Sequence, residues 1–129
     1  MPIEFVAPQT TGETLAFCVA LATLLVGLIF MTIPHRFGRF LGIYDMSASG
    51  ISELRSAFGG SWVGFALAAI LFAQPLIYLA LGTAFVFMVI GRVISFLADR
   101  SFNGQTVAAL LIEAAAGFGL LAYPLQIIP

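Results

Sequence analysis

Four apolar stretches, each about 20 residues long, constrain this chain more than any other feature of its sequence. They run from about Thr14 to Ile33, Ser52 to Ala73, Leu76 to Ala98 and Gln105 to Leu125. A helix of about 20 residues crosses the roughly 30 Å hydrocarbon core of a bilayer and satisfies its own backbone hydrogen bonds there. The sequence therefore predicts an all-α membrane protein, with a four-transmembrane-helix bundle as a single domain over residues 1–129.

The composition excludes a globule in water. Hydrophobic residues make up 61% of the chain and charged residues only 9%, with a mean hydropathy of +1.10. A soluble domain carries about 25% charged residues, so this chain has too little polar surface. The expected surroundings are the lipid bilayer. The net charge is −1 and no lysine is present, so no nucleic-acid partner is expected.

The arginines predict the orientation of the helices. They lie in or near the first and third connections, at Arg36, Arg39, Arg55, Arg92 and Arg100. Neither terminus and neither residue of the connection at 74–75 is basic. Cytoplasmic loops are enriched in Lys and Arg. We therefore expect a multi-pass protein of the bacterial inner (cytoplasmic) membrane with both termini on the periplasmic side.

The first connection has a pattern of its own. Phe37, Phe40, Leu41 and Tyr44 recur at helical spacing, which predicts an apolar stripe on a short helix. Such a helix would lie on the inner membrane surface. An ordinary loop is the alternative.

Small residues recur every four positions on the second apolar stretch, at Ser56, Gly60, Gly64 and Ala68. In lipid, small residues let helix backbones approach closely, so that van der Waals packing holds the helices together. We expect these residues to form the seam of the bundle. The alternative is a homodimer through Gly60 and Gly64.

Charged residues inside the spans are the strongest functional signal. At a rise of 1.5 Å per residue, Arg92 lies about 10 Å and Glu113 about 13 Å from the cytoplasmic ends of their helices. Arg55 approaches from the same side, with Glu53 beside it at the mouth of the second span, and Asp99 shares a helix face with Arg92 seven residues further on. The pattern predicts an intramembrane charge cluster of Arg55, Arg92, Glu113, Glu53 and Asp99.

Pairing is expected within this cluster, because an isolated charge in hydrocarbon costs at least about 2.5–3.5 kcal/mol. Glu113 would pair with Arg92 or Arg55. Three interpretations stay open. The cluster is an internal network that fixes helix register, a site for a polar headgroup, quinone or partner subunit, or a proton relay.

Other chemistry finds little support. Cys18 and His35 are the only residues of their types, so no metal site or cofactor is expected, and His35 is interpreted as a surface residue. Trp62 is interpreted as packed core, with a pigment- or lipid-facing role as the alternative. The chain has no Ser-His-Asp or phosphate-loop pattern, so no catalytic residues and no enzyme activity are predicted.

The segments SELRSAFGG and GRVISFLADRSFNG, together with Glu113, resemble a family of small bacterial four-helix membrane proteins of unknown function, related to the DoxX-like group. The matching positions are Glu53, Arg55, Gly59 and Gly60, then Gly91, Arg92, Asp99 and Gly104, and finally Glu113. The resemblance covers roughly the last three helices. It implies a fold and transfers no activity.

Our leading functional hypothesis is an accessory or assembly subunit of a larger membrane complex. Connections are short, and 13 phenylalanines offer apolar surface for other membrane subunits or for lipid, quinone or pigment. The alternative is a small transporter or a lipid- or quinone-binding protein that uses Arg55, Arg92 and Glu113.

Overall fold

The computed structural model describes residues 5–72 and 74–129, and every regular element in them is helical. The elements are α1 (Thr11–Thr32), α2 (Pro34–Phe40), α3 (Ala48–Glu53), the π-helix η1 (Leu54–Gly60), α4 (Ser61–Phe72), α5 (Pro75–Ala98) and α6 (Gly104–Leu121). Because α3, η1 and α4 follow one another without a break, they form one long helix, Ala48–Phe72.

Among the described residues, four helices are long and apolar enough to cross a membrane, as the sequence predicts. Their bounds differ from the expected ones by a few residues. The fourth ends at Leu121 rather than Leu125, and residues 122–126 form turns. Pro124 has no N–H and disfavours a helical residue before it, which explains the earlier end. Ala73, the expected end of the second span, lies outside the described residues.

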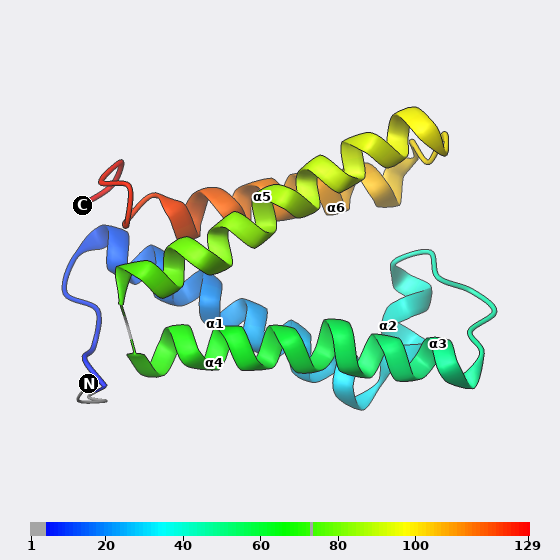
Figure 1. Cartoon of the computed structure of the whole chain (residues 1–129), viewed down its shortest axis with the longest axis horizontal. Helices are drawn as coiled ribbons and strands as arrows, with labels where there is room; N and C mark the ends of the chain where they lie inside the picture. The colour runs from blue at the N-terminus through cyan, green and yellow to red at the C-terminus, as the bar shows by residue number, and fades with distance from the viewer. Residues whose placement is uncertain (1–4, 73) are drawn as a thin grey trace.

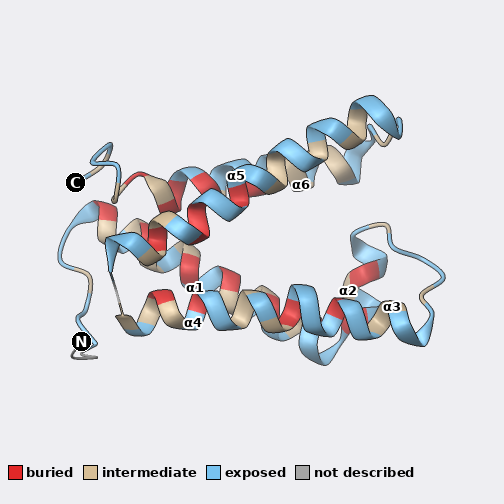
Figure 2. Cartoon of the chain, in the orientation of Figure 1, coloured by how far each residue is buried: buried red, intermediate tan, exposed pale blue. Residues whose placement is uncertain are grey.

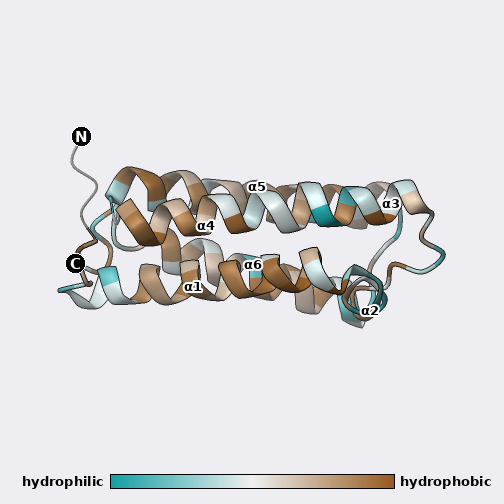
Figure 3. Cartoon of the chain, turned by 90° about the horizontal axis from the view of Figure 1, so that it is seen from below, coloured by the Kyte–Doolittle hydropathy of each residue, from teal (hydrophilic) through white to brown (hydrophobic). Residues whose placement is uncertain are grey.

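The helices form two pairs. One pair is α1 with η1 and α4, and the other is α5 with α6. The pairs lie together at the end that holds both termini and diverge toward the end that holds α2 and α3 (Figure 1). In Figure 3, α2 is seen end-on, so it runs across the direction of the long helices.

Polar side chains cap the helices where the chain re-enters the bundle. Ser47 Oγ accepts a hydrogen bond from the N–H of Gly50 at 3.1 Å, at the start of α3. Asn103 and Thr106 bond to each other's backbone N–H groups, both at 3.0 Å, as a capping box for α6. These bonds satisfy N–H groups that have no partner within their helix.

The core lies at the end with the termini. It consists of Ala16, Ala20, Ala69, Tyr78, Leu81, Phe85 and Leu120. Figure 2 shows buried positions gathered there and along the contact of α1 with α4. Three of these seven residues are alanines, which let the backbones pack closely and compensate for the weak hydrophobic drive within lipid. At the opposite end, the two helix pairs diverge (Figure 1).

The seam predicted from Ser56, Gly60, Gly64 and Ala68 is wrong, because other residues make the closest helix contact. The close approach between α1 and η1 is made by Gly27 and Gly59: a Cβ on Gly59 would lie 3.2 Å from the carbonyl oxygen of Gly27. Ser56 and Gly64 are exposed, and a Cβ on Gly64 would meet nothing within 4 Å.

The π-helix is the cause of this difference. Its hydrogen bonds span five residues rather than four. Positions spaced by four, such as Ser56 and Gly60, therefore rotate off a common face as they pass through η1. Of the predicted ridge, Gly60 and Ala68 are partly buried, and Ala66 and Ala69 are the buried alanines of α4.

Candidate functional site

A cavity of about 280 Å³ lies between the two helix pairs. It is lined from α1 by Val19, Ala22, Thr23, Val26 and Phe30, from α2 and the residue after it by Phe37, Phe40 and Leu41, from η1 and α4 by Phe58 and Trp62, from α5 by Phe85, Met88 and Arg92, and from α6 by Ala109, Ile112, Glu113 and Ala116. Its volume is close to the lower limit of small-molecule sites, which measure roughly 300–1,000 Å³.

A run of aromatic rings forms one wall of this cavity. Phe30 packs edge-on against Phe37 with ring centroids 4.7 Å apart, and lies 5.6 Å from Phe58 with the two rings tilted by 33°. Trp62 continues the run, 6.0 Å from Phe30 and 5.8 Å from Phe85. Aromatic pairs at such distances are favourable in edge-on and offset geometries. The wall is therefore a set of flat apolar faces that runs from α2 to α5.

The Arg92–Glu113 ion pair is the charged part of the lining. Nε of Arg92 donates to Oε2 of Glu113 at 2.8 Å, and Nη2 donates to Oε1. The Glu113 side chain is 8% exposed and that of Arg92 29%. This two-pronged geometry is the strongest that Arg and a carboxylate form, and it is the one ion pair within residues 5–72 and 74–129.

Small residues on α6 allow this pair to form. Gly117 lies one turn after Glu113, and a Cβ on it would lie 3.4 Å from Cβ of Phe85 on α5. Residues four apart share a helix face, so this close approach brings the α5 backbone near the face that bears Glu113. Arg92, two turns beyond Phe85, then reaches the carboxylate.

Arg92 keeps hydrogen-bonding capacity for a ligand. A guanidinium has five N–H donors. Glu113 accepts hydrogen bonds from two of them, the N–H of Nε and one N–H of Nη2. Nη1 has no hydrogen-bond partner among the described residues. The pair is electrically neutral as a whole, yet Arg92, which lines the cavity, keeps N–H donors that Glu113 does not use.

Arg55 does not join this pair, which corrects the predicted cluster. Its Nη1 donates to the backbone carbonyl oxygen of Met31, in the last turn of α1. The reason is the pairing of the helices: η1 lies against α1, whereas Arg92 and Glu113 belong to the other pair. The two pairs diverge at this level (Figure 1).

Glu53 and Asp99 also lie apart from the ion pair. Glu53 is exposed at the end of α3. Asp99 caps the end of α5 and accepts a hydrogen bond from Ser95 Oγ at 2.9 Å. Ser95 Oγ lies 2.9 Å from Ser101 Oγ as well. Ser95, Asp99 and Ser101 therefore belong to the turn between α5 and α6. Of the five residues predicted to cluster, Arg92 and Glu113 are the two that contact each other.

Side chains of α2 line the end of the cavity beside that helix. Phe37 and Phe40 line it, and Gln105 Nε2 on α6 donates to the carbonyl oxygen of Phe40 at 3.2 Å. Tyr44, expected on the same helical stripe, lies beyond α2 and is 63% exposed. The short helix is thus confirmed, and it covers the cavity with the aromatic residues of its stripe.

A separate polar cluster lies at the end with the termini. Tyr123 Oη donates to Oε1 of Glu13 at 2.7 Å, and the rings of Tyr78 and Tyr123 pack edge-on at 6.3 Å. The hydrogen bond to the Glu13 carboxylate, with burial and the charge of that carboxylate, raises the pKa of the Tyr123 phenol.

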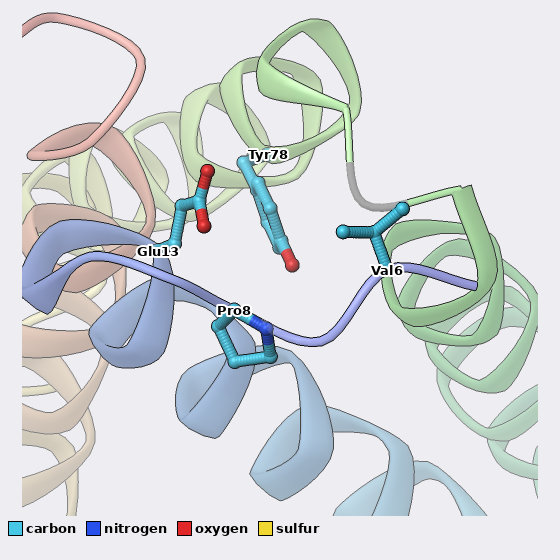
Figure 4. A pocket seen from close by; sticks show the side chains of 4 residues that line it. All are labelled: Val6, Pro8, Glu13 and Tyr78. Carbon is cyan, nitrogen blue, oxygen red and sulfur yellow. The ribbon is translucent and has the colours of Figure 1, made fainter. Parts of the chain in front are cut away.

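Val6 and Pro8 of the N-terminal segment lie against Glu13 and Tyr78 (Figure 4). The enclosed space of about 30 Å³ suits a water molecule rather than an organic ligand. This end is therefore a structural closure of the bundle.

The remaining polar candidates are peripheral. His35 and Cys18 are exposed. Within the described part of the chain, no group of three His, Cys, Asp or Glu side chains is arranged to hold a metal ion. Trp62, interpreted as packed core, instead stands half-buried in the cavity wall.

Sequence reasoning missed the aromatic lining. Phe30, Phe58 and Phe85 look like ordinary apolar residues of long spans, because almost every neighbour is apolar too. A partial signal existed in their spacing: Phe58 and Trp62 are four residues apart and so share a helix face. Nothing in the sequence showed which other helices this face meets.

The comparisons with known proteins give a family and no activity. No curated protein and no solved structure matches the chain. Residues 13–124 match a family described as "Domain of unknown function (DUF4345)". This match spans all four candidate membrane helices almost completely. The chain is therefore a multi-pass membrane protein that belongs to the DUF4345 family.

Proposed function

We propose that this protein is not an enzyme and that it binds a neutral, membrane-soluble molecule with carbonyl oxygens, of the quinone type, in the cavity between its helix pairs. The observation that carries the proposal is the Arg92–Glu113 pair in the wall of an otherwise mostly apolar cavity. Ligand sites typically combine an apolar lining with a few polar groups that fix orientation.

The charge of the pair argues for a neutral ligand. Glu113 already neutralises Arg92 through two hydrogen bonds. An anionic headgroup would approach the carboxylate as well as the guanidinium, and an added net charge at this depth is costly. A carbonyl oxygen needs only the donors that Glu113 leaves unused on Arg92.

The aromatic wall argues for a flat ligand. Phe30, Phe58, Trp62 and Phe85 present ring faces and edges along one side of the cavity. A conjugated ring gains from offset or edge-on contact with such side chains. A saturated acyl chain would fill the same space without using this geometry.

Native mass spectrometry of protein extracted in mild detergent tests the proposal. The expected result is a bound species with the mass of an isoprenoid quinone. The double variant R92Q/E113Q, which removes both charges and leaves polar side chains in their place, should lose it. The control Leu97→Ala alters a side chain that is 82% exposed and should keep it. A wild-type protein that carries no such molecule, even after incubation with a quinone, would contradict the proposal.

The second candidate is an accessory or assembly subunit. It is favoured by the exposed face of Ser56 and Gly64, which no part of the described chain covers. A helix of another subunit or of a second copy fits such a surface. Co-purification in mild detergent tests it: Gly64→Leu should release a partner, whereas the cavity variant R92Q/E113Q should not.

We further propose a bacterial inner membrane location with both termini periplasmic, and a distant relationship to the DoxX-like group. The basic residues support the orientation, because all five lie toward the end opposite the termini. With Cys18 replaced by Ala, a single cysteine added at residue 127 should react with a membrane-impermeant maleimide in intact spheroplasts. A cysteine at residue 36 should react only after permeabilisation, and the reverse pattern would overturn the orientation.

A further inference from the structure

A second cavity of about 180 Å³ adjoins the first, between α4 and α5. It is lined by Thr23, Ser61, Trp62, Phe65, Leu81, Ala84, Phe85 and Met88. Four of these residues, Thr23, Trp62, Phe85 and Met88, line the first cavity too. The two spaces are thus separated by side chains alone.

The side chains that line both cavities include some that can change conformation. Met88 is unbranched and adapts its shape readily. The Trp62 and Phe85 rings stand 5.8 Å apart at an interplanar angle of 54°, and Trp62 is only half-buried. A modest rotation of Trp62 or Met88 would join the two spaces.

The second cavity faces outward, toward the surface that meets lipid. Ser61 and Ala84 are exposed on opposite walls, and Phe65 is 57% exposed. These residues belong to candidate membrane spans, so their exposed surface lies against acyl chains rather than water.

The first cavity is bounded differently at its two ends. Beside α2, a hydrogen bond from Gln105 to the backbone carbonyl oxygen of Phe40 links α6 to α2. Toward the termini, α1 and α6 are tightly packed, since a Cβ on Gly119 would lie 2.8 Å from a methyl carbon of Val19.

We infer that the ligand is a lipid with a long apolar chain, that its ring lies beside Arg92 and Glu113, and that its chain leaves through the second cavity, between α4 and α5, into the bilayer. This inference rests on the proposed function. The first cavity accommodates a ring and the start of a chain, because it is no larger than a small ligand site. The rest of the chain stays in the membrane, so the ligand enters and leaves sideways.

Two probes test the route: 2,3-dimethoxy-5-methyl-1,4-benzoquinone, and the same ring with a decyl chain. Binding to purified protein in detergent is followed by quenching of the fluorescence of Trp62, the single tryptophan. Ala84→Phe fills the second cavity from α5, and Ser61→Leu fills it from α4. Ala115→Phe, on the exposed face of α6 and in the lining of neither cavity, is the matched control.

Ala84→Phe and Ser61→Leu should each weaken binding of the decyl probe about tenfold, which corresponds to lost burial of about two methylene groups. Binding of the chainless probe should stay within about twofold of wild type, which also shows that the variants are folded. Equal losses for both probes, or none for either, would overturn the route and leave the proposed function standing. Failure of the wild type to bind either probe would overturn both.

Discussion

Arg55 donates a hydrogen bond from its guanidinium to the carbonyl oxygen of Met31, and so joins the start of the second span to the end of the first. The last four carbonyl groups of a helix have no partner within it. Pro34, just beyond α1, offers no N–H to them. A cation at this end also interacts favourably with the helix dipole. Arg55 is therefore a cap for α1.

Replacing Arg55 by Ala should lower stability by about 1 kcal/mol, because it removes a charged hydrogen bond and a favourable dipole contact. Thermal unfolding in detergent, followed by circular dichroism, measures the change. Arg36→Ala removes an exposed arginine of α2 and serves as the control. Identical melting of the two variants would show that the cap contributes nothing.

Gly59 and Gly64 should respond in opposite ways to the same substitution. A Cβ on Gly59 would lie 3.0 Å from the backbone nitrogen of Met31, and α1 would have to move away. Gly59→Ala should therefore destabilise the protein by about 1–3 kcal/mol. Gly64→Ala meets open space and should be neutral or stabilising by up to about 1 kcal/mol, from helix propensity alone. Equal melting temperatures would place the seam elsewhere.

Removal of Glu113 should impair folding more than removal of an apolar neighbour. Glu113→Ala leaves the Arg92 charge without its partner in the membrane interior, at a cost of about 2.5–3.5 kcal/mol. The monodisperse fraction in size-exclusion chromatography should fall below that of Leu110→Ala. The inverted pair R92E/E113R should recover part of the yield. If both alanine variants give the same yield, the ion pair does not stabilise the fold.

Tyr123 and Glu13 should make stability depend on alkaline pH. The raised pKa of Tyr123 means that the folded protein holds the phenol proton more tightly than the unfolded chain does. This contribution is complete below the unfolded pKa of about 10 and is lost as pH rises through the folded value.

Tyr123→Phe should accordingly be less stable than wild type at pH 8. The difference should disappear once the pH exceeds the raised pKa that Tyr123 has in the folded protein. Parallel melting curves at pH 8 and at strongly alkaline pH check this. A difference that does not change with pH would mean that the hydrogen bond to Glu13 has no linkage to folding.

The spans could be predicted from sequence because their length and apolar character follow directly from the thickness of the bilayer. The depth of Arg92 and Glu113 could be predicted as well, since each residue of a helix adds a fixed rise. Rotation about the helix axis could not. A π-helix at Leu54–Gly60 has no signature in a chain where most neighbours are apolar, and it shifts Gly59 rather than Gly60 into the seam.

The placement of Arg55 escaped prediction for a related reason. Depth alone puts Arg55 near the ion pair, but the order of helix pairing decides which carbonyl or carboxylate lies within its reach. That order depends on close contacts in which a glycine meets its partner on another helix, such as Gly27 with Gly59 and Gly82 with Leu121. Such matches become visible only when both partners are known.

Trp62 provides a direct readout of quinone binding beside Arg92 and Glu113, because it is the single tryptophan and lines the cavity there. A quinone in contact with an indole ring quenches its fluorescence. Titration of the protein in detergent with the decyl benzoquinone should give saturable quenching in wild type and in the exposed-residue control Leu97→Ala. The R92Q/E113Q variant should show only the weak, linear quenching of free collision. Linear quenching of the same size in all three proteins would contradict the account.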